Sequence, residues 1–281
     1  MARILIAGCG DVGSILGLDL VQAGHQVWGL KRHPATLPAG IQPLAADLTD
    51  SATLFGLPPA LDFVFYTAAA DGFSETCYRR AYVEGVRNLL AALARADQRP
   101  RRILFTSSTS VYAQHQGEWV DEDSPAEAAG FSGHSLREGE TLLWNGPCPA
   151  TVVRFGGIYG PGRSRLIDSV RRGAATCVER PPVYTNRIHR DDAAAVLRHL
   201  MAFADPAPLY LGVDDYPAPQ CEVMRWLAEQ LGAPEPRVVT TAEGAEAAMR
   251  ASKRCRNARL RATGFCFRYP SYREGYAALL G

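Results

Sequence analysis

Short apolar runs alternate with helix-patterned stretches along the first 155 residues. The runs are bounded by turn residues and fall at Ile4 to Ala7, Gln26 to Leu30, Phe63 to Thr67, Ile103 to Thr106 and Thr151 to Phe155. Strands that are buried on both faces of a parallel sheet have this near-continuous apolar character, and the stretches between them supply the crossover helices. The pattern therefore predicts an α/β fold built on a doubly wound parallel sheet.

Apolar residues at helical spacing predict where the crossover helices lie. Between residues 12 and 23 they form a stripe that ends at Gly24, a residue suited to a helix C-terminus. Residues 78 to 96 form a longer helix by the same criterion. Further helices are expected from Asp191 or Asp192 to about Met201, and from Gln220 to Leu231, where Gly232 follows.

The composition of the chain changes after about residue 155, where glycines and prolines cluster. We expect residues 1–155 to form a Rossmann-type domain to which 186–212 returns. Residues 156–185 and 213–281 are then a smaller C-terminal α/β portion that binds the substrate. One large domain with a companion is consistent with 281 residues.

Charge and cysteine content narrow the class of partner. Thirty Lys and Arg balance 29 Asp and Glu, so no electrostatic argument favours nucleic acid or an anionic membrane, and a small molecule is the expected partner. The seven cysteines are odd in number, with no CxxC pair and no metal-ligand spacing, which suits a reducing compartment. With no signal peptide or membrane span recognisable, we expect a cytoplasmic protein without a metal.

The segment AGCGDVG contains a GxGxxG pattern between the first strand and the first helix. Gly8 permits a tight turn, Gly10 lets a pyrophosphate approach the backbone, and Gly13 allows close helix–sheet packing. Asp11 and Val12 begin the helix, whose N-terminus faces the phosphates. The alternative is a glycine-rich turn without a ligand, but this context favours dinucleotide binding.

The end of the second strand bears on the choice of cofactor. NAD-preferring sites usually carry Asp or Glu there to bind the ribose 2′-hydroxyl, whereas this chain has Lys31 and Arg32. A guanidinium binds a 2′-phosphate through charge-assisted hydrogen bonds, so the pair points to NADP(H). An exposed basic pair on a loop is the alternative interpretation, and NAD stays the alternative cofactor.

Several further segments, in order along the chain, resemble the extended, epimerase/dehydratase-like branch of the short-chain dehydrogenase/reductase family. They are Ala46-Asp47-Leu48, Thr67-Ala68-Ala69-Ala70, ILFTSSTSVYA, RFGGIYGPGR, NRIHRDD and RYPSYREGY. The resemblance covers nearly the whole chain and implies a Rossmann fold. It implies that Asp47, with Leu48, contacts adenine and that Ala68, Ala69 and Thr106 line the cofactor. It also implies that Ser108, with Ser107 beside it, holds a substrate oxygen, although a serine that bonds local backbone is the competing interpretation.

The YxxxK pair that normally relays the proton in this family is missing. If Glu140 is aligned with the family's downstream Glu, Ser132 takes the Tyr position and Leu136 the Lys position; a shift of one residue gives Gly133 and Arg137. Neither register supplies a phenol. The chain therefore resembles atypical members that keep the cofactor site and lose the standard catalytic residues, with Ser132 as the candidate at the Tyr position.

Other side chains are weaker candidates for chemistry. Tyr112, His134, Tyr159 and Tyr184 could transfer protons, but each is expected to be structural. Arg163 follows YGPG, where extended members often contact an anionic substrate; a surface salt bridge is its alternative. We interpret His189, Asp191 and Asp192 as helix-start residues rather than acid/base groups.

Two functions follow from these patterns. The first is an NADP(H)-dependent oxidoreductase or epimerase-like enzyme, for which the resemblance makes a sugar nucleotide the default substrate class. The second is a non-catalytic protein that senses NADP(H) and acts through a protein partner, which the missing Tyr and Lys favour. A homodimer, common in the family, would form through residues 78–96 and 132–145.

Overall fold

The computed structural model describes residues 1–128, 130–240 and 252–281, which form two compact units. Unit 1 contains Met1–Val111, Ala128–Arg154 and Ala194–Tyr210. Unit 2 contains Tyr112–Glu127, Phe155–Ala193 and Leu211–Gly281. The chain thus crosses between the units several times, although each unit is compact by itself.

Unit 1 is built on a seven-stranded parallel sheet with the order β12-β7-β5-β4-β1-β2-β3. The strands are β1 (Arg3–Ala7), β2 (Gln26–Lys31), β3 (Gln42–Ala45), β4 (Phe63–Tyr66), β5 (Arg102–Ser108), β7 (Ala150–Phe155) and β12 (Leu209–Gly212). The predicted doubly wound α/β fold is confirmed. The strand order reverses between β1 and β4, and ligands of such sheets bind at the carboxyl ends of the strands at this point.

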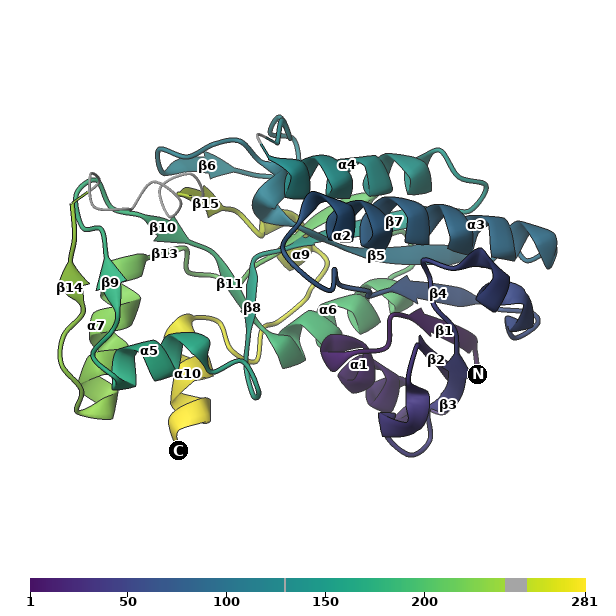
Figure 1. Ribbon diagram of the computed structural model, residues 1–281, viewed down its shortest axis with the longest axis horizontal. Helices are drawn as coiled ribbons and strands as arrows, with labels where there is room; N and C mark the ends of the chain where they lie inside the picture. Colours follow the sequence, from purple (N-terminus) through teal and green to yellow (C-terminus); the bar gives the residue numbers. More distant parts are fainter. Residues whose placement is uncertain (129, 241–251) are drawn as a thin grey trace. The chain divides into compact units, whose positions relative to one another are not determined.

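Helices cover both faces of this sheet, with α3 and α4 on one side and α1 and α6 on the other (Figure 1). The helical segments are α1 (Asp11–Gln22), η1 (Pro34–Thr36), η2 (Ser51–Gly56), α2 (Glu75–Arg79), η3 (Arg80–Glu84), α3 (Gly85–Arg95), η4 (Thr109–Val111), α4 (Phe131–Trp144) and α6 (Arg190–Ala202). The predicted helix over 78–96 is interrupted by η3, a π-helical turn.

Unit 2 consists of small pieces of sheet and short helices. Among its described residues the strands pair as β10-β13, β11-β8, β14-β9 and β15-β6. Their bounds are β6 (Glu118–Val120), β8 (Gly157–Tyr159), β9 (Thr176–Cys177), β10 (Tyr184–Thr185), β11 (Arg187–His189), β13 (Ala218–Pro219), β14 (Arg237–Val238) and β15 (Lys253–Cys255). The helices are α5 (Arg165–Arg171), α7 (Gln220–Leu231), α9 (Ala258–Ala262) and α10 (Tyr272–Leu280).

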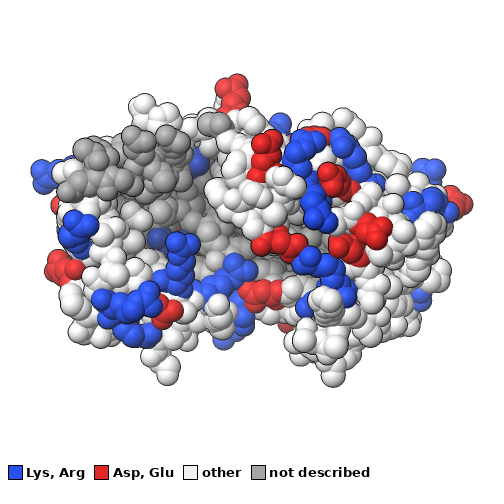
Figure 2. All heavy atoms as spheres, viewed as in Figure 1, with Lys and Arg blue, Asp and Glu red and all other residues white. Residues whose placement is uncertain are grey.

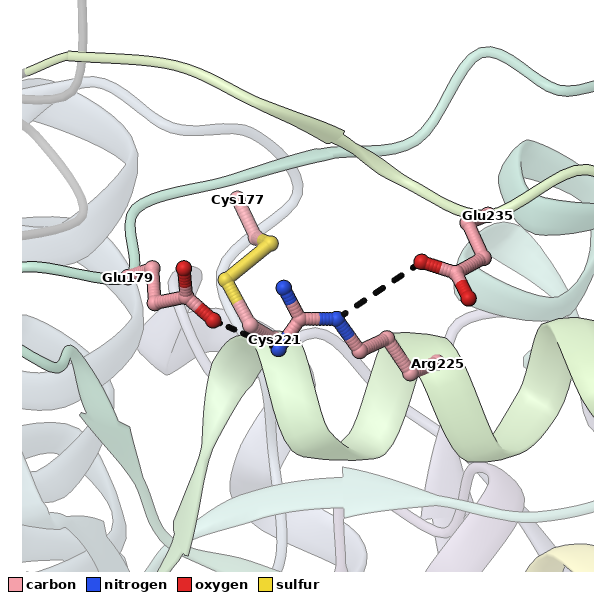
Figure 3. The surroundings of a disulfide bond; sticks show 5 residues. All are labelled: Cys177, Glu179, Cys221, Arg225 and Glu235. Atoms are coloured by element: carbon pink, nitrogen blue, oxygen red, sulfur yellow. Dashed lines mark ion pairs between the residues drawn. A yellow bond between two sulfur atoms is a disulfide. The ribbon is translucent and has the colours of Figure 1, made fainter.

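A disulfide joins β9 to the start of α7 in unit 2. Cys177 and Cys221, separated by 44 residues, are both buried. Figure 3 shows Arg225 on α7 beside them, where it forms ion pairs with Glu179 and Glu235. From the odd number of cysteines we inferred a reducing compartment, and we did not predict this disulfide. The other five cysteines, all within the described residues, are free.

The division of the chain differs from the predicted one over residues 112–127 and 186–193, and residues 155 and 211–212 also belong to unit 2. Residues 112–127 belong to unit 2, because β6 pairs with β15 in the register Glu118↔Lys253. Residues 186–193 also belong to unit 2, because β11 pairs with β8. Both assignments depend on pairings between distant segments, which local patterns do not reveal. None of the helices described is long and apolar enough to cross a membrane.

Candidate cofactor site

The glycine-rich turn after β1 has the backbone shape of a phosphate-binding turn. Gly8 has φ of +84°, and a Cβ there would overlap the Cα of Ala68. A Cβ on Gly13 would lie 2.8 Å from Oγ1 of Thr67, because α1 packs closely on the sheet. Around Gly10 the nearest atom to such a Cβ is 3.9 Å away, so the backbone there is open to a ligand. The three glycines thus meet the three different requirements of a dinucleotide turn.

Hydrogen bonds from both neighbouring strands hold this turn. The carbonyl of Leu30 on β2 accepts the N–H of Gly8 at 3.0 Å, and the hydroxyl of Thr67 after β4 donates to the carbonyl of Gly8 at 3.0 Å. The helix α1 begins at Asp11, and no side chain caps it at Gly10. Because a helix N-terminus attracts anions, the turn fits the pyrophosphate of a dinucleotide. The predicted contributors are Gly8, Gly10, Asp11, Val12 and Gly13.

Lys31 ends β2 and Arg32 directly follows it, and each of these two basic residues has a partner in unit 1. Nζ of Lys31 donates to the hydroxyl of Thr36 at 3.2 Å. Arg32 forms a bidentate ion pair with Asp71: Nη1 lies 2.8 Å from Oδ2 and Nη2 lies 2.6 Å from Oδ1. Both side chains of this ion pair are more than half exposed. The guanidinium is therefore at the surface but already engaged.

Asp47, the residue expected near adenine, lies close to this ion pair. Its Oδ1 accepts the N–H and the hydroxyl of Thr49, each at 2.8 Å. Burial alone would raise the pKa of Asp47, but the Thr49 hydrogen bonds and the nearby Arg32 and Arg80 outweigh it, so the pKa of Asp47 is lowered. Asp47 is thus a fixed carboxylate. Its neighbour Leu48 is buried, whereas Ala68 is half-buried and Ala69 exposed.

The three hydroxyl residues at the end of β5 point in alternating directions. Ser107 is buried, and its hydroxyl donates to Oε1 of Glu140 at 2.6 Å. Thr106 and Ser108 are half-buried on the opposite face; Oγ1 of Thr106 donates to the carbonyl of Tyr66, and Oγ of Ser108 accepts the N–H of Ser110 at 3.2 Å. The bond to Glu140 argues against Ser107 as a substrate ligand and leaves Ser108 as the better candidate.

The start of α4 contains the positions of the missing YxxxK pair. Ser132 is half-buried in the first turn, and Leu136 is buried in the core. In the shifted register, Gly133 is buried, and Arg137 is held by Oε2 of Glu140 at 2.6 Å. Neither register brings a phenol or a free cation to the helix start.

The weaker candidates lie apart from the turn in sequence, and several have structural partners. The Tyr112 hydroxyl donates to the carbonyl of Asp121 at 2.8 Å, and the Tyr159 hydroxyl to that of Ser271 at 3.4 Å. Tyr184 lies under the guanidinium of Arg254. His134 and Arg163 are exposed, the former on α4 in unit 1 and the latter in unit 2.

His189, Asp191 and Asp192, which were expected at a helix start, lie at the start of α6, and Asp192 also binds the C-terminal segment. Nδ1 of His189 accepts the N–H of Asp191 at 3.3 Å, next to the first turn of α6. The two oxygens of Asp192 accept the N–H groups of Arg268 and Tyr269, each at 2.9 Å. These contacts are structural, as interpreted, but the partners of Asp192 lie 76 and 77 residues away.

Two features of unit 1 escaped the sequence patterns. Asp71 has no motif around it, and its role as the partner of Arg32 depends on β2 and β4 lying on either side of β1. Arg154 is buried in β7, where its Nε and Nη2 donate to Glu140 at 2.9 and 2.7 Å. The sequence signal that could have revealed this pair was Arg154 itself, a charged residue inside an apolar run.

Comparison with known proteins agrees with this geometry. The model of the NAD dependent epimerase/dehydratase family matches residues 4–202. The chain belongs to this family. Its members include epimerases, dehydratases and reductases that use NAD(P), and the matched segment contains the glycine-rich turn, Arg32, Asp71 and Glu140.

The chain is similar to proteins from several organisms. A protein of Methylobacillus flagellatus, whose structure is described as of the NAD-dependent epimerase/dehydratase type, is 39% identical with a TM-score of 0.82, covering 99% of this chain and 97% of that one. The 3-diazoavenalumate denitrifying reductase of a Streptomyces species is 28% identical over 85% of each chain. A human epimerase family protein, solved with NADPH, shares the fold at 20% identity and a TM-score of 0.81, covering 99% of both chains.

Proposed function

We propose that this chain binds NADP(H) and transfers hydride between the nicotinamide and the carbonyl or hydroxyl carbon of a small organic substrate. The observation that carries the proposal is the three-glycine turn at the switch point of the sheet, with its tight Gly8, open Gly10 and closely packed Gly13. Arg32 supports NADP(H) over NAD(H), since an acidic residue at its position would repel a 2′-phosphate.

The residues of the chain would divide the work as follows. The glycine-rich turn and the start of α1 bind the pyrophosphate, while Asp47 and Arg32 bind the adenosine end. When bound, the nicotinamide supplies or accepts the hydride. The hydroxyl of Ser108, half-buried at the end of β5, holds the substrate oxygen beside it. Ser132 takes the position of the usual proton donor and is the remaining candidate for that role.

A fluorescence titration of the full chain with NADPH, and separately with NADH, tests the cofactor assignment. We expect tighter binding of NADPH, and we expect Arg32→Ala to weaken NADPH about tenfold or more while leaving NADH within about twofold. Arg101→Ala is the matched control, because Arg101 is an exposed arginine of unit 1 paired with Asp62 at the start of β5, away from the turn. Equal affinities would refute the preference for NADP(H), and no binding of either would refute the proposal.

Oxidation of NADPH in the presence of small aldehydes, ketones and nucleotide sugars tests the chemistry. The name of the Streptomyces relative makes a reductase reaction a reasonable first assay, and the family resemblance adds nucleotide sugars. With any active substrate, we expect Ser108→Ala to lower kcat about 10- to 100-fold. Ser110→Ala, two residues on and exposed, is the control. An unchanged kcat in Ser108→Ala would remove Ser108 from the mechanism.

A second candidate function is a non-catalytic protein that senses NADP(H) and acts through a protein partner. The missing Tyr and Lys favour it, because the buried Leu136 carries no charge that could assist a proton donor at Ser132. Tight NADPH binding together with a nucleotide-dependent change in affinity for a partner, and no turnover, would support this function over the first.

The proposal includes a cytoplasmic location and a homodimer through residues 78–96 and 132–145, both inferred from sequence. At the surface of unit 1, Glu138 of α4 pairs with Arg79 at the end of α2 and with Arg87 of α3. Sedimentation at several protein concentrations tests the dimer. Acidic and basic side chains are interspersed over the face drawn in Figure 2, which supports a small molecule rather than nucleic acid as the ligand.

A further inference from the structure

The ion pair between Arg32 and Asp71 crosses the carboxyl end of β1. Arg32 directly follows β2 and Asp71 follows β4, and β1 pairs with both of these strands. Strands two places apart in a sheet are about 10 Å from each other, and Asp71 lies in the loop beyond Tyr66, the last residue of β4, so the ion pair joins segments that leave the sheet on either side of β1. The glycine-rich turn that begins at Gly8 leaves the sheet at this end of β1.

The carboxylate of Asp71 uses the same face of Arg32 that a phosphate would use. Both terminal nitrogens of the guanidinium donate to the two carboxylate oxygens, at 2.8 and 2.6 Å. A phosphate monoester is bound by arginine through the same pair of parallel hydrogen bonds. Asp71 and a 2′-phosphate therefore cannot both make this contact with Arg32.

This ion pair is easily opened. The side chains of Arg32 and Asp71 are 54% and 63% exposed, and exposed ion pairs contribute little to stability. Asp47, the other carboxylate near Arg32, is held by two hydrogen bonds from Thr49 and is not free to follow the guanidinium. Asp71 is thus the carboxylate that an incoming anion would displace.

We propose that Asp71 is a specificity-determining residue, which competes with the 2′-phosphate of NADP(H) for Arg32. When NAD(H) binds, the ion pair between Arg32 and Asp71 stays formed beside the adenosine end of the cofactor. The inference rests on the proposed function, because it requires Arg32 to be the 2′-phosphate ligand. A dianionic phosphate can replace a carboxylate on the guanidinium, whereas the 2′-hydroxyl of NAD(H) cannot. Asp71 therefore lowers the affinity for NADP(H) and leaves that for NAD(H) nearly unchanged.

Titration of Asp71→Asn with NADPH and with NADH tests the competition. The amide retains the size of the side chain but removes its charge, so NADPH should bind about threefold to tenfold more tightly, while NADH changes less than about twofold. Asp97→Asn is the matched control, because Asp97 is exposed in unit 1 just after the C-terminus of α3. Its φ of +47° is one that asparagine readily adopts.

A double variant separates competition from a general effect of charge. In the Arg32→Ala background, Asp71→Asn should change NADPH affinity by less than about twofold, since the contested contact is gone. An equal gain with and without Arg32, or an equal gain for NADPH and NADH, would overturn the inference while the proposed function stands. If the parent chain bound neither nucleotide, the proposed function and this inference would fail together.

Discussion

Each unit of the molecule buries a carboxyl group close to an arginine, but the two carboxyl groups differ in how many of their hydrogen bonds are made. In unit 1, both oxygens of Glu140 accept hydrogen bonds from Arg154, and Ser107 and Arg137 add one each. In unit 2, Oδ1 of Asp214 accepts the N–H of Tyr216, whereas its Oδ2 has no hydrogen-bond partner among the described residues.

The arginines differ in the same way. Arg154 donates two bonds to Glu140 and is only 2% exposed. Arg187 lies near enough to Asp214 to lower its pKa, but its Nη1 also lacks a partner in the described part of the chain. Burial outweighs this attraction and raises the pKa of Asp214 to about 8. The hydrogen bonds around Glu140 are thus complete, whereas the buried Asp214 lacks one and its raised pKa favours the protonated carboxyl group.

The largest effect on stability is expected from Glu140→Gln. The variant leaves the buried Arg154 without a counter-charge, which should lower the free energy of unfolding by about 3–5 kcal/mol. Denaturant unfolding followed by tryptophan fluorescence measures the change. Glu138→Gln on the same helix loses only partly exposed ion pairs and should cost less than about 1 kcal/mol. Equal losses in the two variants would contradict the role assigned to Glu140.

A somewhat smaller effect is expected from opening the disulfide of unit 2. Closing a loop of 44 residues restricts the unfolded chain, a contribution of up to about 4 kcal/mol. Unfolding should therefore begin at lower denaturant when dithiothreitol is present. The Cys177→Ala/Cys221→Ala variant should be insensitive to the reductant, whereas Cys266→Ala, at an exposed free thiol, should respond as the parent does. A parent chain indifferent to reductant would show that this bridge does not stabilise the fold.

The smallest of the three effects concerns pH and Asp214. The ordinary pKa of the group is 3.8 and its folded pKa about 8, so between these values the folded chain holds a proton that the unfolded chain has lost. Its contribution to stability is complete below about pH 4, falls as the pH rises, and is gone above about pH 8. Asp214→Asn should flatten this decline by on the order of 2 kcal/mol between pH 6 and pH 8.

Thermal unfolding of Asp214→Asn and the parent across this pH range provides the measurement. Asp205→Asn, at an exposed aspartate of unit 1, is the control. Parallel pH profiles for Asp214→Asn and the parent would mean that Asp214 is ionised in the folded chain.

Much of unit 1 could be predicted because its signals are local. The apolar runs at residues 4–7, 26–30, 63–67, 103–106 and 151–155 each became a strand of the central sheet. The pattern around Gly8, Gly10 and Gly13 predicted a turn whose geometry meets the requirements of a dinucleotide site. In these cases the residues that determine the conformation are neighbours in sequence, so periodicity and turn chemistry were sufficient.

The contacts that only the tertiary structure decided join residues far apart in sequence. Arg32 meets Asp71 because β2 and β4 flank β1, and Cys177 meets Cys221 because β9 lies against the start of α7. The pairing of β6 with β15 assigns residues 112–127 to unit 2. Single-sequence patterns contain no information on such pairs, since each partner is an ordinary residue in its own segment. The sequence by itself therefore determined the fold class and the candidate cofactor turn, and tertiary packing decided which charges and thiols pair.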